Sequence, residues 1–142
     1  MKFANNIIKD LLVDDRLGEG SDRVVYDFLW DPTLVMKIAK DDPSQNITEW
    51  QIWEAVQGTK KAEWLAPCVR LTTCGRVLLQ KRVEPLRRAE FPKKLPSFIV
   101  HDLHISHFGW YEGRIVCCDY GISHWDAKFS GKMRKIRKDS IV

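Results

Sequence analysis

Three charged residues in this sequence lie in settings that are unusual for charged side chains. Lys37 is in the middle of the apolar segment LVMKIAK, Glu49 follows in a segment of helical character, and Asp119 comes at the end of the apolar run in GRIVCCDYG. A charged amine inside an apolar strand needs a partner or a route to the surface. Glu49 could supply that partner, so the pair indicates either a structural ion pair or part of a binding site.

Two glycines, Gly18 and Gly20, lie in the segment LGEGSDRVVY between two predicted strands. Because glycine has no side chain, backbone amides around it can approach a phosphate group closely. Glycine is also common in ordinary hairpin turns. The two glycines therefore indicate either a turn or a phosphate-binding loop.

Three of the four histidines, His101, His104 and His107, surround Asp102 in the segment HDLHISHFG. One interpretation is a three-histidine metal site. On a helix this spacing would send the first and last rings to different sides, and in a strand His104 would point away from the other two. The preceding apolar FIV indicates a strand passing into a loop, which favours a polar loop that carries Asp102.

The elements that must position these residues follow from composition and spacing. Segments ending near residue 17 and covering 23–30 and 34–40 have the β-branched and aromatic content of strands, with turn residues at Asp31 and Pro32. In 46–57, Asn46 is a predicted cap, and Ile47, Trp50, Trp53 and Val56 recur at helical spacing. Two more hairpins are predicted, one turning at Cys74 and Gly75 and the other at Glu112 and Gly113. The sequence therefore predicts an α+β fold with an antiparallel sheet and one main helix.

In this order the motifs resemble those of the protein kinase and aminoglycoside phosphotransferase superfamily. LGEGSDRVVY is similar to its glycine-rich loop, LVMKIAK to the strand with the phosphate-binding lysine, and NITEWQIWEAV to the helix that supplies the glutamate. HDLHISHFG resembles the catalytic loop and DYG the metal-binding D-F-G motif. The resemblance covers about residues 17–121, and the compact form of the catalytic loop is similar to small kinase-like proteins of tailed bacteriophages.

The resemblance implies a role for each matching residue. Gly18, Gly20 and Val25 would surround ATP, Lys37 would hold its phosphates with Glu49 fixing the amine, and backbone groups near Gln80, Lys81 and Arg82 would bond the adenine, which Val25 and Leu79 would sandwich. Asp102 and Lys37 would be the catalytic residues. Asp119 and His107 would hold Mg²⁺ or Mn²⁺.

Departures from the family pattern accompany these matches. Arg23 stands at the third glycine position, where it could neutralise phosphate charge or plug the site. His107 stands where the family has a metal-binding asparagine. Only about 21 residues follow Gly121, too few for the usual helical lobe and peptide platform. The chain is therefore expected to be either an ATP- and metal-dependent phosphotransferase or a degenerate kinase fold that binds and inhibits a host protein.

Charge divides the chain into two parts. The net charge is +4, and residues 126–142 carry six Lys and Arg against two Asp. We expect a kinase-like domain over 1–125, with an N-lobe over about 1–82 and a reduced C-lobe over about 83–125, followed by a basic tail over 126–142. The tail suggests a different function class, a nucleic-acid-associated module that binds phosphates through it.

Composition indicates the cellular setting. No apolar run approaches the length of a membrane span, so no membrane association is expected. No export signal is recognisable, and the four cysteines lack a C-x-x-C pair, which favours reduced thiols and a cytoplasmic location. With a missing lobe, exposed apolar surface would be covered by a host protein or by a second copy in a homodimer.

Overall fold

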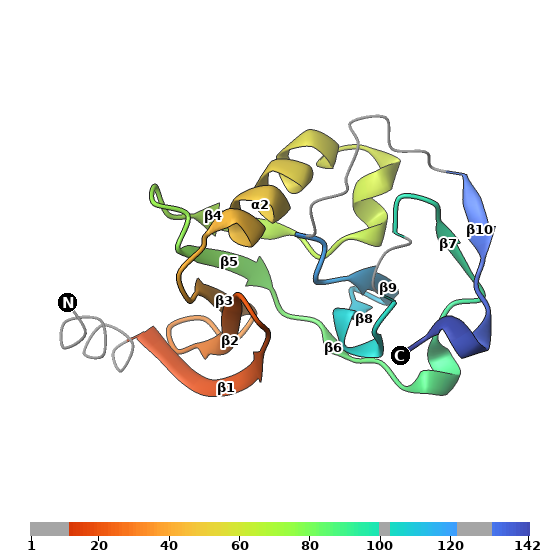
Figure 1. The fold of residues 1–142 in the computed structure, drawn as a ribbon, viewed down its shortest axis with the longest axis horizontal. Helices are drawn as coiled ribbons and strands as arrows, with labels where there is room; N and C mark the ends of the chain where they lie inside the picture. Colours follow the sequence, from red (N-terminus) through yellow and green to blue (C-terminus); the bar gives the residue numbers. More distant parts are fainter. Residues whose placement is uncertain (1–11, 100–102, 122–131) are drawn as a thin grey trace.

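The computed structural model describes residues 12–99, 103–121 and 132–142. Its largest element is a five-stranded antiparallel sheet in the order β1-β2-β3-β5-β4 (Figure 1). These strands are β1 (Val13–Glu19), β2 (Arg23–Phe28), β3 (Leu34–Ala39), β4 (Cys68–Leu71) and β5 (Val77–Lys81). The predicted α+β class, with an antiparallel sheet and one main helix, is confirmed.

Short-range chemistry explains the turns of this sheet. Between β2 and β3, the Asp31 carboxylate accepts hydrogen bonds from the Thr33 backbone N–H at 2.9 Å and from its hydroxyl at 2.6 Å, an arrangement that fixes the turn. Between β4 and β5, Gly75 has a φ of 76°, which glycine adopts without strain. Both hairpins lie where the sequence predicts them.

The main helix, α2 (Ser44–Val56), crosses the sheet beside β4 and β5 (Figure 1). It begins before Asn46, so the prediction that Asn46 caps the helix is wrong. Asn46 and Glu49 are buried with Ile52 and Val56 along one side of α2. The buried side of the helix is thus polar in its first half and apolar in its second half, which an apolar periodicity alone does not show.

A second, three-stranded antiparallel sheet has the order β6-β8-β9. Its strands are β6 (Glu84–Pro85), β8 (Phe108–Tyr111) and β9 (Arg114–Cys117). Glu112 and Gly113 both have positive φ, 48° and 77°, as expected for the tight hairpin turn predicted there. Ala66 N–H donates to Cys117 O at 2.8 Å, which joins β9 to the chain entering β4. The 3-10 helices η1 (Lys60–Trp64) and η3 (Ile105–His107) precede β4 and β8.

The basic C-terminal segment is tied to the body of the protein. Strand β10 (Met133–Lys135) pairs antiparallel with β7 (Lys94–Pro96), and the 3-10 helices η2 (Arg88–Glu90) and η4 (Lys138–Ser140) flank this pair. Ile136 and Ile141 are buried in the core. Of the expected tail, residues 132–142 are therefore packed against the domain rather than extended from it.

One hydrophobic cluster joins both sheets, α2 and the C-terminal segment. Leu65, Leu78, Leu95 and Phe108 are all buried within it. The expected division of the chain near residue 82 therefore does not separate two cores. In the part of the chain that the structure describes, no helix is both long and apolar enough to cross a membrane.

Candidate functional site

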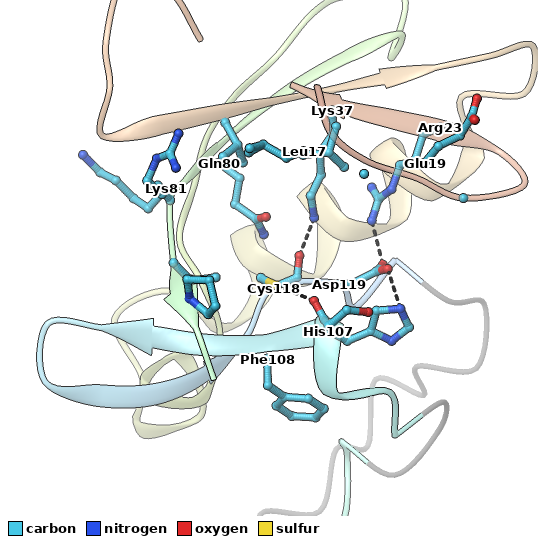
Figure 2. A pocket seen from close by; sticks show the side chains of 18 of the residues that line it. Leu17, Glu19, Arg23, Lys37, Gln80, Lys81, His107, Phe108, Cys118 and Asp119 are labelled. Carbon is cyan, nitrogen blue, oxygen red and sulfur yellow. Dashed lines mark hydrogen bonds and ion pairs between the residues drawn. The ribbon is translucent and has the colours of Figure 1, made fainter. Parts of the chain in front are cut away.

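A cavity of about 490 Å³ lies between the five-stranded sheet and the segment that carries β8 and Asp119 (Figure 2). This volume is in the range of small-molecule sites. Strands β1, β2, β3 and β5 form one side, and residues 105–108 and 118–119 form the other. The sequence-predicted residues that line it are Gly18, Gly20, Val25, Lys37, Gln80, Lys81, His107 and Asp119.

Lys37 and Glu49 form a buried ion pair at the inner end of this cavity. Lys37 is 4% exposed and Glu49 is fully buried. The Lys37 ammonium donates to Glu49 Oε1 and to the backbone carbonyl of Cys118 (Figure 2 shows the latter). Gln80 Nε2 also donates to Glu49 Oε1, at 3.0 Å. The predicted partner of the strand lysine is thus present, and the pair also reaches the chain next to Asp119.

Asp119 follows β9 and faces the cavity from the opposite side. Its Oδ1 lies 2.7 Å from Arg23 Nη2 and its Oδ2 lies 3.1 Å from His107 Nε2. Burial raises the pKa of Asp119, whereas the charges of Lys37, Arg23 and His107 lower it. The lowering is the larger effect, so the pKa lies below the ordinary value of 3.8. Asp119 is therefore ionised and held by nitrogen donors on both oxygens.

Arg23 occupies the space between the two carboxylates. It begins β2, is 5% exposed, and its Nη2 lies 2.5 Å from Glu49 Oε2 as well as against Asp119. Burial lowers the pKa of Arg23, and the charges of Glu49 and Asp119 more than offset this, so the pKa is raised. The expected alternatives for Arg23 were neutralising phosphate or plugging the site; in the structure its guanidinium is paired with the protein's own carboxylates.

Asn46 is a site residue that the sequence analysis missed. Its Oδ1 accepts from Arg23 Nη1 at 3.0 Å, and its Nδ2 lies 3.1 Å from the backbone carbonyls of Lys37, Gly75 and Arg76. The available signal was the spacing of Asn46 and Glu49, three residues apart on a helix, which places both on one side. Asn46 positions the Arg23 guanidinium from the first turn of α2.

The glycine turn between β1 and β2 closes one end of the cavity. Gly20 N–H donates to Arg23 O at 2.9 Å across the turn. A side-chain carbon at Gly18 would meet no atom within 4 Å, and one at Gly20 would approach only Arg23 O at 3.9 Å. The packing of the protein itself therefore does not require glycine at either position.

At the other end of the cavity, the expectation for Leu79 is wrong. Side chains alternate along β5, so Gln80 lines the cavity, whereas Leu79 is absent from its lining and Val35 contributes the apolar surface instead. The Lys81 N–H donates to Pro67 O at 2.9 Å and the Arg82 N–H donates to Thr33 O at 2.8 Å. These two amides are therefore already used by the sheet.

The remaining predicted residues divide between described and undescribed parts of the chain. Asp102, the expected catalytic aspartate, and His101 lie outside the described residues. His104 Nδ1 lies 2.6 Å from Ser106 Oγ, and its ring centroid is 5.3 Å from that of His107. Within residues 12–99, 103–121 and 132–142, no three His, Cys, Asp or Glu side chains are grouped in a way that could hold a metal ion.

The four cysteines are free thiols, and Cys118 lines the cavity. Burial raises the pKa of Cys118 to about 11, with Lys37 opposing this and Asp119 adding to it. Cys68 lies 3.2 Å from the Tyr120 hydroxyl, deeper in the core. Burial thus keeps the Cys68 and Cys118 thiols protonated at neutral pH, which indicates packing rather than nucleophilic chemistry.

Taken together, these groups form a charge-balanced cluster of two cations and two carboxylates beneath a glycine turn, open to a cavity with apolar walls. A scan of the sequence against protein-family models gives no match, and a search of curated proteins gives no significant match.

Proposed function

We propose that this chain is a nucleotide-binding protein of protein-kinase-like architecture that acts by binding rather than by efficient phosphoryl transfer. The observation that carries the proposal is that Lys37 and Asp119 line one cavity beneath the turn of Gly18 and Gly20, while Glu49, which does not line the cavity, is bonded to the Lys37 ammonium. The separate motifs could bind one ligand together only if their side chains meet at a common pocket.

The shape and lining of the cavity support a nucleotide as the ligand. Leu17, Val25 and Val35 line it from the large sheet and Leu86 and Phe108 line it from the other side, which leaves apolar surfaces for a planar base. The buried cations Lys37 and Arg23 lie toward the other end, where Figure 2 shows their side chains directed toward Cys118 and Asp119, with Lys81 on the other side of Gln80. Phosphates would lie at that end and the base near β5.

A backbone carbonyl near β5 adds a hydrogen-bond acceptor for the base. Lys81 N–H donates to Pro67 O, but proline has no N–H and cannot return the bond that an antiparallel pair normally makes. The Lys81 carbonyl is thus available to an exocyclic amine such as that of adenine. Adenine is therefore the base we propose.

The two glycines support a phosphate ligand. The packing of the protein does not require glycine at either position. A ligand that approaches the backbone closely would explain why both residues are glycine. A side chain at Gly18 would project into space that the phosphates would occupy. Backbone amides in such turns bind anions.

Binding is favoured over transfer because the acidic groups are already engaged. Both oxygens of Asp119 have nitrogen partners, and Glu49 Oε2 is bonded by Arg23. Phosphoryl transfer in kinases depends on carboxylates that hold metal ions on the phosphates. Because its carboxylates are paired with the protein's own cations, the cluster keeps the cavity for the nucleotide but is poorly suited to phosphoryl transfer.

Isothermal titration calorimetry with ATP and ADP tests the proposal. We expect saturable binding that Lys37→Met weakens by about tenfold or more, whereas Lys40→Met, at an exposed lysine that pairs with Glu19, leaves it unchanged. No heat at millimolar nucleotide with the folded wild-type protein would refute nucleotide binding. Incubation with γ-labelled ATP tests transfer: label that Asp102→Ala abolishes would assign a phosphotransferase instead.

A second candidate function rests on a basic surface around β7 and β10. Lys94 and Lys135 are directly opposite in the pairing of these strands and both are exposed, although like charges in such pairs are destabilising. An anionic partner would relieve this repulsion. Exposed basic residues are frequent in the two segments that contain these strands, and they are Arg87, Arg88, Lys93, Lys94, Lys132, Arg134, Lys135, Arg137 and Lys138.

We propose that this basic surface binds the phosphate backbone of nucleic acid. Fluorescence anisotropy with a DNA duplex should show affinity that falls steeply as salt rises. The variant Lys94→Gln/Lys135→Gln should bind more weakly than the matched control Lys60→Gln/Lys61→Gln. An affinity that ignores salt, or equal loss in both variants, would refute this function, and selective binding of polyglutamate over DNA would assign an acidic protein partner instead.

A further inference from the structure

The family resemblance implies a divalent metal ion at Asp119 and His107, and the side chains present do not fit one. Mg²⁺ is bound by carboxylate and other oxygen ligands with little distortion of its geometry. Here Asp119 Oδ1 is bonded to Arg23 and Oδ2 to His107, at 2.7 and 3.1 Å. Each oxygen keeps a second lone pair, but a metal ion bound there would lie next to the positively charged Arg23 guanidinium. The second expected ligand, His107, would offer a nitrogen in place of oxygen, which Mg²⁺ disfavours.

The charge balance of the cluster gives a second reason. Arg23 and Lys37 carry two positive charges, and Glu49 and Asp119 carry two negative charges, all within hydrogen-bonding distance. Arg23, Lys37 and Glu49 are each at most 5% exposed. The Asp119 side chain is 31% exposed, so a divalent cation would bind at the edge of the cluster. It would still add uncompensated positive charge next to the buried Arg23, which is costly where solvation is limited.

The position of Arg23 gives the third reason. Its guanidinium lies between Glu49 and Asp119, and Asn46 fixes it from a third side at 3.0 Å. A guanidinium has five N–H donors, and these bonds use three of them, which leaves two for a further acceptor in the cavity that Arg23 lines. Arginine suits phosphate because its planar donors match phosphate oxygens.

We propose that Arg23 is a built-in cation that takes the place of the divalent metal, so that this site binds a purine nucleotide directly and without a metal ion. This inference rests on the proposed nucleotide binding for its ligand, but the exclusion of metal by Arg23 stands on the cluster alone. Arg23 would contact the phosphates beside Lys37. The site would then respond to the concentration of free nucleotide rather than to that of its magnesium complex.

Manganese binding without nucleotide tests the exclusion of metal. Electron paramagnetic resonance of Mn²⁺ should show only the free ion in the presence of the wild-type protein. The variant Arg23→Gln removes the charge while keeping much of the length, and we expect it to bind Mn²⁺ in a way that adding Asp119→Asn abolishes. The matched control Arg16→Ala, at an exposed arginine that pairs with Glu19, should behave as wild type. Far-UV circular dichroism checks that each variant is folded.

Calorimetry with ADP in EDTA and in excess Mg²⁺ tests the metal-free ligand. The expected result is a weaker apparent affinity in excess Mg²⁺, because Mg²⁺ sequesters the free nucleotide that the site binds. An affinity in Mg²⁺ that equals or exceeds the affinity in EDTA, or stoichiometric Mn²⁺ binding to wild type that Asp119→Asn removes, would overturn the inference. Absence of heat in both buffers would overturn the proposed nucleotide binding and the phosphate contact, while the manganese result separately decides whether Arg23 excludes a metal. The wild-type measurements decide even if Arg23→Gln does not fold.

Discussion

The variant Glu49→Gln tests the central contact of the site. Glu49 is fully buried and accepts from Arg23 at 2.5 Å, from Gln80 at 3.0 Å and from Lys37. Glutamine has the same shape, but its amide nitrogen is a donor and would face donors. Among the described residues, Arg23 would then keep its ion pair with Asp119, whereas Lys37 would lose the carboxylate it is paired with. Removing one member of a buried charge network costs about 3–5 kcal/mol.

That loss is large relative to the stability of a domain, which is typically about 5–15 kcal/mol. For a chain of this size it corresponds to a fall in melting temperature of about 10 °C. Urea unfolding followed by tryptophan fluorescence would measure the change in the free energy of unfolding. The control is Glu54→Gln, an exposed glutamate on the same helix, which should change it by no more than about 0.5 kcal/mol.

Equal unfolding free energies for the Glu49 and Glu54 variants would refute the reasoning, because they would mean that the buried network contributes nothing. A double-mutant cycle with Lys37→Met isolates the ion pair itself. Residues in direct contact show coupling of about 0.5–3 kcal/mol, so purely additive effects of the two changes would also contradict the structure.

Further predictions concern pH, thiol chemistry and backbone packing. The pKa of Asp119 in the folded protein lies below 3.8, so the stabilisation by its carboxylate is present above pH 3.8 and is lost as pH falls through the lower, folded-state pKa. The free energy of unfolding of wild type should therefore fall more steeply below about pH 4 than that of Asp119→Asn. Parallel curves for the two proteins would contradict this. At pH 8, a pKa of about 11 leaves about 0.1% of Cys118 as thiolate, whereas hydrogen bonds from the Arg76 backbone lower the pKa of the exposed Cys74. Iodoacetamide should therefore label Cys74 first by mass spectrometry, and equal rates would count against the burial of Cys118. A side-chain carbon at Gly121 would clash with Gln45 O and lie 2.9 Å from Glu49 Oε2, so Gly121→Ala should destabilise the protein by about 1–3 kcal/mol. Gly18→Ala, whose added carbon would meet no atom within 4 Å, should leave the stability unchanged. An unchanged stability of Gly121→Ala would show that the chain after Asp119 does not pack against α2.

The sequence by itself determined the local structure and the residue types of the site. The apolar run in 34–40 predicts β3, and turn residues at Gly75 and Gly113 predict the hairpins, because strand and turn preferences act over a few residues. Lys37 was recognisable because an amine is rare inside an apolar strand. The helix position of Glu49 was also predictable, since it depends on spacing along one element.

Only the tertiary structure decided which charges meet. Arg23 and Asp119 are 96 residues apart, and Lys37 and the Cys118 carbonyl are 81 apart; no local pattern encodes such contacts, because they depend on how the chain after β9 lies against β2 and β3. The same is true of Asn46, whose residue type is typical of a helix cap but which in the structure is a buried partner of Arg23. The sequence supplied two cations and two carboxylates, and packing placed each carboxylate against a nitrogen donor from another element because the elements that carry them meet at one cavity.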